Sequence, residues 1–340
     1  MIMTKKLTII LASIAVAATA WAAAPILING AGATFPYPIY SKWFDVYASI
    51  NPDVRFNYQS IGSGGGIKQV TAKTVDFGAS DGPMTDQQLA DAPGRLIHIP
   101  TVMGAVVVTY NVPGVEKGLK LNPDIVADIF LGAITKWNDP RISSANPGVQ
   151  IPDLPLVVVH RSDGSGTTYI FVDYLSSVSG AWKLKVGKGT SVNWPVGLGG
   201  KGNEGVAGLV KQTPGALGYV ELAYAEKNGL AYATIQNKSG KFIEPTLEST
   251  SKAADGVDIP SDFRVSLVNS ANAEAYPIAG FTWLLIYRKM DDPVKGKAIV
   301  DFIKWAVHDG QKYAKDLLYA PLPEGVVGMI DKKLEDIQIA

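Results

Sequence analysis

The sequence predicts an α/β protein of two domains joined by a hinge. Its 340 residues suffice for two domains at a common size of about 150 residues each. Short apolar runs alternate with amphipathic stretches, which indicates strands and helices in turn on mainly parallel sheets. Two longer β-like runs, at 97–111 and 276–288, enclose a middle region of about one domain. If both runs cross between the domains, they form a hinge over a cleft.

The first elements follow from local signals along the chain. The apolar run at 26–29 predicts a strand, and Pro36 or Pro38 then begins a helix that ends at residue 50. The alternation continues with strands at 54–59 and 75–79 and helices at 65–73 and 85–90.

The middle region and the C-terminal part complete this pattern. We expect a helix at 123–131, a strand that ends near His160, and a turn, helix and strand in the Gly-rich segment 197–221. We expect that segment to be structural and not to contact a ligand. Helical patterns at 294–308 and 323–337 follow the second long run. The sequence thus predicts a discontinuous first domain, 25–100 with 278–340, and a second domain, 101–277.

Composition excludes several classes of protein. Hydrophobic residues make up 47% and charged residues 18% of the chain, which is typical of a globular protein. Basic and acidic residues both number 31, so no global charge points to nucleic acid or to an anionic membrane. The chain has no Cys, which rules out disulfides, thiolate metal sites and cysteine nucleophiles.

The N-terminus has the pattern of a secretory signal peptide. Lys5 and Lys6 precede an apolar stretch at 7–20, and small residues at Ala20, Ala22 and Ala24 offer a cleavage site. We predict a signal peptide at 1–24 and export from the cytoplasm; the alternative is an uncleaved membrane anchor. Removing Lys5 and Lys6 changes the balance of 31 basic and 31 acidic residues to a net charge of −2. A bound anion would therefore be held by donors placed around its site, since the protein has no overall positive charge to attract it.

The segment HRSDGSGTTYIF, residues 160–171, is dense in hydrogen-bond donors. A strand ends before it and a helix begins near Ser165, so free N–H groups at the helix start can bind an anion. Arg161 adds a planar cation suited to an oxyanion, and Asp163 is placed to orient it. Ser165 and Thr167 add hydroxyls. The alternative is an ordinary helix N-cap.

Three further strand-to-helix junctions carry polar residues. In AGATFPYP (31–38) Thr34 can cap a helix or donate to a ligand, and in SIGSGGGIKQV (60–70) Ser63 follows a strand without a Walker pattern. In VDFGASDGP (75–83) Asp81 is either a turn residue or an acceptor for the proton of hydrogen phosphate. Together the four loops predict a cage of neutral donors with one Arg.

At this point the sequence resembles a known family. AGATFPYPIYSKW, IGSGGGIKQV, VDFGASDGPM, RSDGSGTTYIF, WPVGLGGKGNEGVAGLVKQTPGALGYVELAYA and DLLYAPLPEGVV are similar to segments of the periplasmic phosphate-binding proteins of phosphate ABC transporters, over about residues 28–327. The resemblance implies the type II periplasmic-binding-protein fold, with two crossing strands as the hinge and one phosphate between two lobes. The phosphate ligands it implies are Thr34, Phe35, Ser63, Asp81, Arg161, Ser165, Gly166 and Thr167, with Asp163 pairing with Arg161.

The resemblance also carries expectations about partners. It implies a periplasmic monomer without cofactor or metal, which binds phosphate without reacting with it and delivers it to a membrane permease. Gly64 stands where relatives often have a second Ser, which removes a peripheral hydroxyl. His98, His160 and His308 lack metal-ligand spacing.

Three other functions remain open from the residues. One is a secreted phosphatase with Ser165 as the nucleophile, although no His is placed in sequence to activate it. Another is a protein that binds sulfate or molybdate, and Asp81 argues against sulfate because sulfate has no proton to donate. The third is an extracellular adhesion scaffold that holds phosphate.

Overall fold

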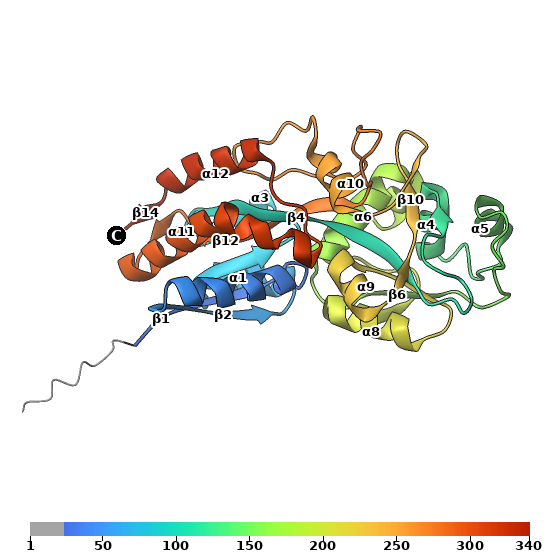
Figure 1. The fold of residues 1–340 in the computed structure, drawn as a ribbon, viewed down its shortest axis with the longest axis horizontal. Coiled ribbons are helices and arrows are strands. Elements are labelled where there is room, and N and C mark those ends of the chain that lie inside the picture. Colours follow the sequence, from blue (N-terminus) through green and yellow to red (C-terminus); the bar gives the residue numbers. More distant parts are fainter. Residues whose placement is uncertain (1–23) are drawn as a thin grey trace, which may run out of the picture.

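The computed structural model describes residues 24–340, and a long mixed sheet flanked by helices forms its framework (Figure 1). The predicted signal peptide, 1–24, lies outside the described residues except for Ala24. Within the described part of the chain, no helix combines the length and the apolar character that crossing a membrane requires.

The main sheet is divided by a change of partners along β4. Its strands run in the order β2-β1-β3-β12-β4-β8-β6-β7, and β9 also pairs with β4. These strands are β1 (Ile26–Gly32), β2 (Val54–Ser60), β3 (Phe77–Ser80), β4 (Leu96–Tyr110), β6 (Val157–Arg161), β7 (Leu198–Gly200), β8 (Ala216–Glu221), β9 (Ala231–Tyr232) and β12 (Ala279–Tyr287). β4 pairs with β12 up to Ala105 and with β8 from Val106 onward. We call β2, β1, β3, β12 and the start of β4 the first half-sheet, and the remaining strands with the end of β4 the second half-sheet.

The two long β-like runs of the sequence lie beside each other where the half-sheets meet. β4 passes from one half to the other (Figure 1). The start of the second run, residues 276–278 just before β12, lies at the same place. There the Val106 N–H donates to the Ile278 carbonyl (2.8 Å), and the Tyr276 hydroxyl donates to the Val106 carbonyl (3.1 Å). The chain therefore passes twice between the halves at neighbouring positions. The predicted two-lobe α/β fold is confirmed.

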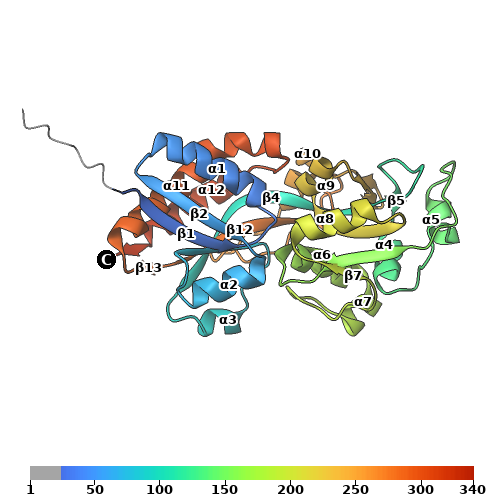
Figure 2. The ribbon, with the colours of Figure 1, turned by 90° about the horizontal axis from the view of Figure 1, so that it is seen from below.

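Helices cover the first half-sheet on both faces. α1 and α11 lie on one side and α2 on the other (Figure 2). The helices around this half are α1 (Tyr37–Ile50), α2 (Ser63–Thr71), α3 (Asp86–Ala90), α11 (Pro293–Val307) and α12 (Glu324–Glu335), with 3-10 turns η2 (Asp309–Tyr313) and η3 (Lys315–Leu317). Phe56 of β2 stacks on Phe44 of α1 (4.8 Å between ring centroids) and lies 4.4 Å from the ring of Phe302 of α11. Aromatic packing thus holds both helices on one face.

Shorter elements complete the second half. Its helices are α4 (Pro123–Phe130), α5 (Pro140–Ala145), α6 (Gly166–Val178), α7 (Gly180–Lys185), α8 (Gly202–Gln212), α9 (Leu222–Asn228) and α10 (Leu247–Ser251), with the 3-10 turn η1 (Lys252–Ala254). Two small sheets lie outside the main one: β5 (Lys120–Leu121), β10 (Thr234–Gln236) and β11 (Phe242–Ile243) form the first, and β13 (Lys289–Met290) and β14 (Gln338–Ile339) form the second. The strands and helices predicted from the sequence are present at or near their predicted positions.

Candidate functional site

The parallel register of the first half-sheet brings three strand ends together. Gly32 of β1 pairs with Ser60 of β2 and with Ala79 of β3. The chain therefore leaves all three strands at one edge, where ligands bind in open α/β sheets. The loops at this edge carry Thr34, Ser63 and Asp81.

The second half-sheet supplies the segment that sequence analysis singled out. β6 ends at Arg161, which pairs with Gly200 at the end of β7. Ser165 is the N-cap of α6, and its Oγ accepts a hydrogen bond from the Thr168 N–H (3.0 Å). The capping alternative is therefore present at Ser165. In this capping bond Ser165 Oγ is the acceptor, so Ser165 can still donate its hydroxyl proton to a ligand.

Direct contacts join the predicted residues of the two halves. The Gly166 N–H donates to Ser63 Oγ (2.9 Å), and the Asp81 N–H approaches the same oxygen (3.3 Å). A Cβ atom on Gly166 would lie 2.5 Å from the Asp81 nitrogen and 2.6 Å from Asp81 Oδ2. Only glycine permits this approach, so α6 begins directly against the carboxylate loop.

Asn203, at the start of α8, also belongs to this site. Its Nδ2 donates to Thr34 Oγ1 (2.8 Å) and to Thr167 Oγ1 (3.1 Å). Asn203 therefore bridges residues of the two halves. Segment 197–221 was expected to be structural only, and the contacts of Asn203 with two predicted ligand residues correct that expectation. The available signal was a short strand followed by Gly202 and a helix, the same pattern as in the other loops.

At four buried hydroxyls of the site, the oxygen acts as a hydrogen-bond acceptor. Each oxygen accepts a hydrogen bond from an N–H group, in the following pairs: Thr34 from Asn203, Ser63 from Gly166, Ser165 from Thr168, and Thr167 from Asn203. A hydroxyl has one proton to donate, and none of these four donates to a protein acceptor within residues 24–340. The site therefore presents four hydroxyl donors.

Three tyrosine hydroxyls fix the backbone next to Thr34. They donate to consecutive carbonyls: Tyr58 to Ala33 (2.8 Å), Tyr224 to Thr34 (2.6 Å) and Tyr319 to Phe35 (2.6 Å). In a planar trans peptide the carbonyl and the following N–H point in opposite directions. The first two bonds therefore orient the N–H groups of Thr34 and Phe35, and neither N–H has a hydrogen-bond partner within residues 24–340.

Arg161 is held by a bidentate ion pair, as the sequence analysis expected. Its Nε donates to Asp163 Oδ1 (2.8 Å) and its Nη2 to Asp163 Oδ2 (2.6 Å). Burial opposes ionisation of Asp163, but the hydrogen bonds and charge of Arg161 outweigh it and lower the pKa of that carboxyl. Arg161 Nη1 is buried without a partner in the described part of the chain. The pair aligns the guanidinium and leaves one nitrogen free to donate.

Two buried carboxyls lie close to these donors. Asp81 Oδ1 accepts from the Thr282 hydroxyl (3.0 Å), and burial raises the pKa of Asp81 to about 7 against the opposing effects of Thr282 and Arg161. Glu221 Oε2 accepts from the Ala223 N–H (2.9 Å) and lies 3.3 Å from the Tyr319 hydroxyl oxygen, and burial holds the pKa of Glu221 well above the usual value. No sequence motif marks Thr282 or Glu221 as a site residue.

Comparison with known proteins identifies the family. A family model described as a PBP superfamily domain matches residues 17–309. The chain is 47% identical over 309 residues to the phosphate-binding protein PstS of Xylella fastidiosa (strain 9a5c), covering 90% of this chain and 84% of the relative. It is 47% identical over 306 residues to the PstS protein of Pasteurella multocida (strain Pm70), covering 89% and 88%. The chain belongs to the PstS family of this superfamily.

Solved structures share the PstS-family fold at lower identity. A phosphate-binding protein from Stenotrophomonas maltophilia matches with a TM-score of 0.67 at 20% identity, covering 91% of this chain and 93% of that one. A high affinity periplasmic phosphate-binding protein solved with phosphate bound matches with a TM-score of 0.71 at 20% identity, covering 90% and 93%. The two-lobe fold of the chain is therefore that of solved phosphate-binding proteins.

In this PstS-family chain, Gly64 lies where the two halves touch. Its N–H donates to the Gly164 carbonyl (2.8 Å), and a Cβ atom at Gly64 would lie 3.0 Å from the Gly164 Cα. From the sequence, only the loss of a hydroxyl is expected at Gly64. The structure adds that the missing side chain allows two backbones to meet.

Proposed function

We propose that the protein binds one hydrogen phosphate ion between its two halves without reacting with it. In this proposal it captures the ion in the periplasm and delivers it to the membrane permease of a phosphate ABC transporter. The observation that carries the proposal is a set of buried donors beside the Asp81 carboxyl: Arg161 Nη1 and four hydroxyls, whose protons have no acceptor within residues 24–340. The names of the PstS relatives support the same ligand.

We assign the ion to the residues predicted from the sequence. Backbone N–H groups of Thr34 and Phe35, four hydroxyls and Arg161 donate to it, and Asp81 faces its proton. The proposed ligands are Thr34, Phe35, Ser63, Asp81, Arg161, Ser165, Gly166 and Thr167, with Asp163 as the partner that orients Arg161. The Gly166 N–H already donates to Ser63 Oγ, so we propose that a phosphate oxygen shares this donor.

Asp81 would select the ion by its proton. Hydrogen phosphate has a proton to donate to a carboxylate, whereas sulfate has none and meets only repulsion from an ionised Asp81. Because burial raises the pKa of Asp81 to about 7, this carboxyl also takes up a proton below neutral pH. A protonated Asp81 can donate to sulfate, so selectivity against sulfate should weaken in acid.

A few such contacts supply enough free energy for a tight site. A micromolar dissociation constant corresponds to about 8 kcal/mol. Hydrogen bonds to a charged group contribute about 1.5–3 kcal/mol each. The proposed donors therefore suffice even after the entropy of ordering and closure is subtracted.

We further propose that the lobes are residues 25–100 with 278–340 and residues 101–277, and that they move about the two crossings. The change of partners on β4 supports a boundary in this region. Small-angle scattering of the mature protein should show a smaller radius of gyration when phosphate is added. An unchanged radius would remove the hinge from the proposal.

The phosphatase alternative assigns Ser165 as a nucleophile, and no observation favours it. Each histidine has a hydrogen-bond partner other than Ser165: His98 bonds the Met84 N–H, His160 the Arg161 carbonyl, and His308 bonds Asp331. Ser165 Oγ accepts from its own helix, as a cap does.

Calorimetry of the mature protein against phosphate, sulfate and a nucleotide tests the proposal, alongside release of phosphate from a chromogenic ester. We expect saturable heat at one phosphate per chain and no ester hydrolysis. At about pH 8.5, where most Asp81 is ionised, we expect sulfate to bind far more weakly than phosphate. No binding of phosphate at millimolar concentration would overturn the proposal. Hydrolysis that Ser165→Ala abolishes would establish the enzyme instead.

A further inference from the structure

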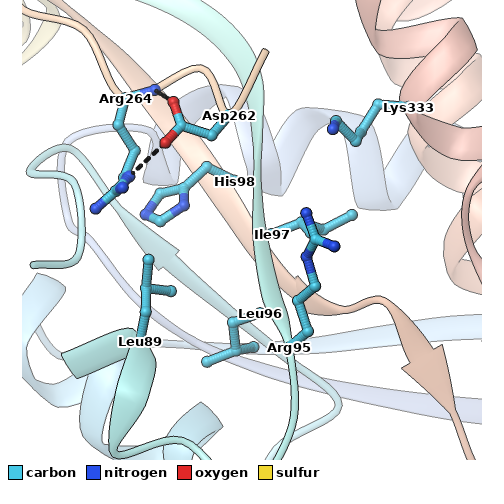
Figure 3. A pocket seen from close by; sticks show the side chains of 8 residues that line it. All are labelled: Leu89, Arg95, Leu96, Ile97, His98, Asp262, Arg264 and Lys333. Carbon is cyan, nitrogen blue, oxygen red and sulfur yellow. Dashed lines mark hydrogen bonds and ion pairs between the residues drawn. The ribbon is translucent and has the colours of Figure 1, made fainter. Parts of the chain in front are cut away.

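A cavity of about 300 Å³ lies at the start of β4, apart from the residues assigned to phosphate. Its walls come from α3, β4, α12 and the connection between η1 and β12. The lining residues are Leu89, Arg95, Leu96, Ile97, His98, Asp262, Arg264 and Lys333 (Figure 3). None of them takes part in the proposed phosphate site.

The charged groups of the cavity are mostly cations. In Figure 3, Arg264 and Asp262 lie on one side, Arg95 and Lys333 lie on the other, and His98 stands between them. Arg264 is paired with two carboxylates, because its Nε donates to Asp262 Oδ2 (2.9 Å) and its Nη1 to Asp86 Oδ1 (2.7 Å), so it offers no free positive charge. Within residues 24–340, neither Arg95 nor Lys333 forms an ion pair.

His98 adds a buried neutral donor. It is 3% exposed, and its Nε2 accepts from the Met84 N–H (3.0 Å), so that nitrogen carries no proton. Burial lowers the pKa of His98 to about 4, which keeps the ring neutral at physiological pH. The ring proton therefore sits on Nδ1, which has no hydrogen-bond partner in the described part of the chain.

The rest of the cavity is apolar and held in place. Leu89 and Leu96 lie below His98 in Figure 3, and Ile97 adds hydrocarbon beside Arg95. Between Asp262 and Arg264 in the sequence, Phe263 is buried in the left-handed region (φ 60°), and its carbonyl accepts from the Trp283 indole N–H (3.1 Å). A non-glycine residue in this region is strained and persists only where its surroundings fix it. Asp262 and Arg264, on either side of Phe263, therefore belong to a fixed wall.

We propose that this cavity is a second binding site, for a small organic anion that carries a carboxylate on an apolar body. Within residues 24–340, Arg95, Lys333 and the His98 Nδ1–H have no acceptor of their own, and such donors suit an oxyanion. A hydrocarbon body gains free energy by contact with the leucine and isoleucine side chains that line the cavity, which a hydrated inorganic ion does not. The size is at the lower end of small-molecule sites, about 300–1,000 Å³. This site is independent of the proposed phosphate function.

Fluorine NMR with para-fluorobenzoate as the probe tests the proposal on the mature protein saturated with phosphate. We expect a saturable change in the probe signal with one site per chain. The double variant Arg95→Gln/Lys333→Gln should weaken binding by about tenfold or more, the equivalent of one charge-assisted hydrogen bond. Lys332→Gln is the matched control, because Lys332 neighbours Lys333 on α12 but does not line the cavity.

Phosphate affinity should be unchanged in all these variants, which shows that they are folded. Three results would overturn the proposal. One is the absence of saturable probe binding at millimolar concentration, and another is equal probe affinity in the double variant and in wild type. The third is displacement of the probe by sulfate as readily as by benzoate, which would mean that the cavity binds any oxyanion.

Discussion

Replacing Tyr224 by phenylalanine removes a single hydroxyl that joins the two halves. This hydroxyl donates to the Thr34 carbonyl at 2.6 Å and thereby sets the direction of the Phe35 N–H, a proposed phosphate donor. It also approaches Glu204 Oε1 at 3.2 Å. The aromatic ring itself remains in Tyr224→Phe, so packing is preserved.

The expected loss follows from what the Thr34 carbonyl retains. It also accepts a longer bond from the Tyr37 N–H (3.2 Å), so the variant does not leave it wholly unsatisfied. The loss should therefore be close to that of one ordinary hydrogen bond, about 1 kcal/mol. This corresponds to a phosphate dissociation constant raised roughly fivefold.

Titration calorimetry of both proteins with phosphate measures this change. Tyr174→Phe is the matched control, because the Tyr174 hydroxyl is buried without a partner in the described chain and lies outside the site. We expect Tyr174→Phe to bind phosphate as wild type does. If a folded Tyr224→Phe protein also binds as wild type does, Tyr224 does not position the Phe35 donor.

Three further predictions concern the charged groups of the site. Asp81→Asn should keep phosphate binding and lose discrimination against sulfate in calorimetry, since an amide can donate to either ion; undiminished rejection of sulfate would refute the selection by proton. The raised pKa of Asp81, about 7, means that the folded protein holds this proton more tightly than the unfolded chain does. Without ligand, the free energy of unfolding should therefore decrease as the pH rises from 5 to 7. Asp81 contributes at most about 1.4 kcal/mol per pH unit to this decrease. Urea titrations should show a smaller fall in Asp81→Asn, and an equal fall in both proteins would contradict this assignment. Asp163→Asn leaves the Arg161 guanidinium buried without its ionic partner, which should lower the free energy of unfolding by about 3 kcal/mol. An unchanged urea midpoint would show that Arg161 needs no such partner.

The sequence predicted the loops of the site because each follows a strand of regular pattern. β1, β2 and β3 are parallel and in register, so the residues just after their ends lie at one edge of the sheet. The ends of these strands can be recognised from the local sequence pattern alone. The pairing of Arg161 with Asp163 was predictable for a similar reason, since the two residues are separated by one position.

The supporting contacts were not predictable in this way. Tyr224 and Tyr319 reach carbonyls 190 and 284 positions away in the chain. Their sequence neighbours are apolar residues of ordinary helices and turns, so periodicity marks these tyrosines only as packed aromatics. Asn203 likewise follows a glycine at a helix start, a place where a capping or turn residue is common. Only the meeting of the two halves gives these side chains their partners.

The hydrogen bonds between the halves have a kinetic consequence. Three hydrogen bonds join the halves near the proposed ion: Gly64 to Gly164, Gly166 to Ser63 and Asn203 to Thr34. An ion enclosed in this way cannot leave by loosening its own contacts one after another. Its residence time would equal the waiting time for the lobes to separate, whatever the chemistry of the occupant. The rate of phosphate release would then be set by the process that separates the two halves.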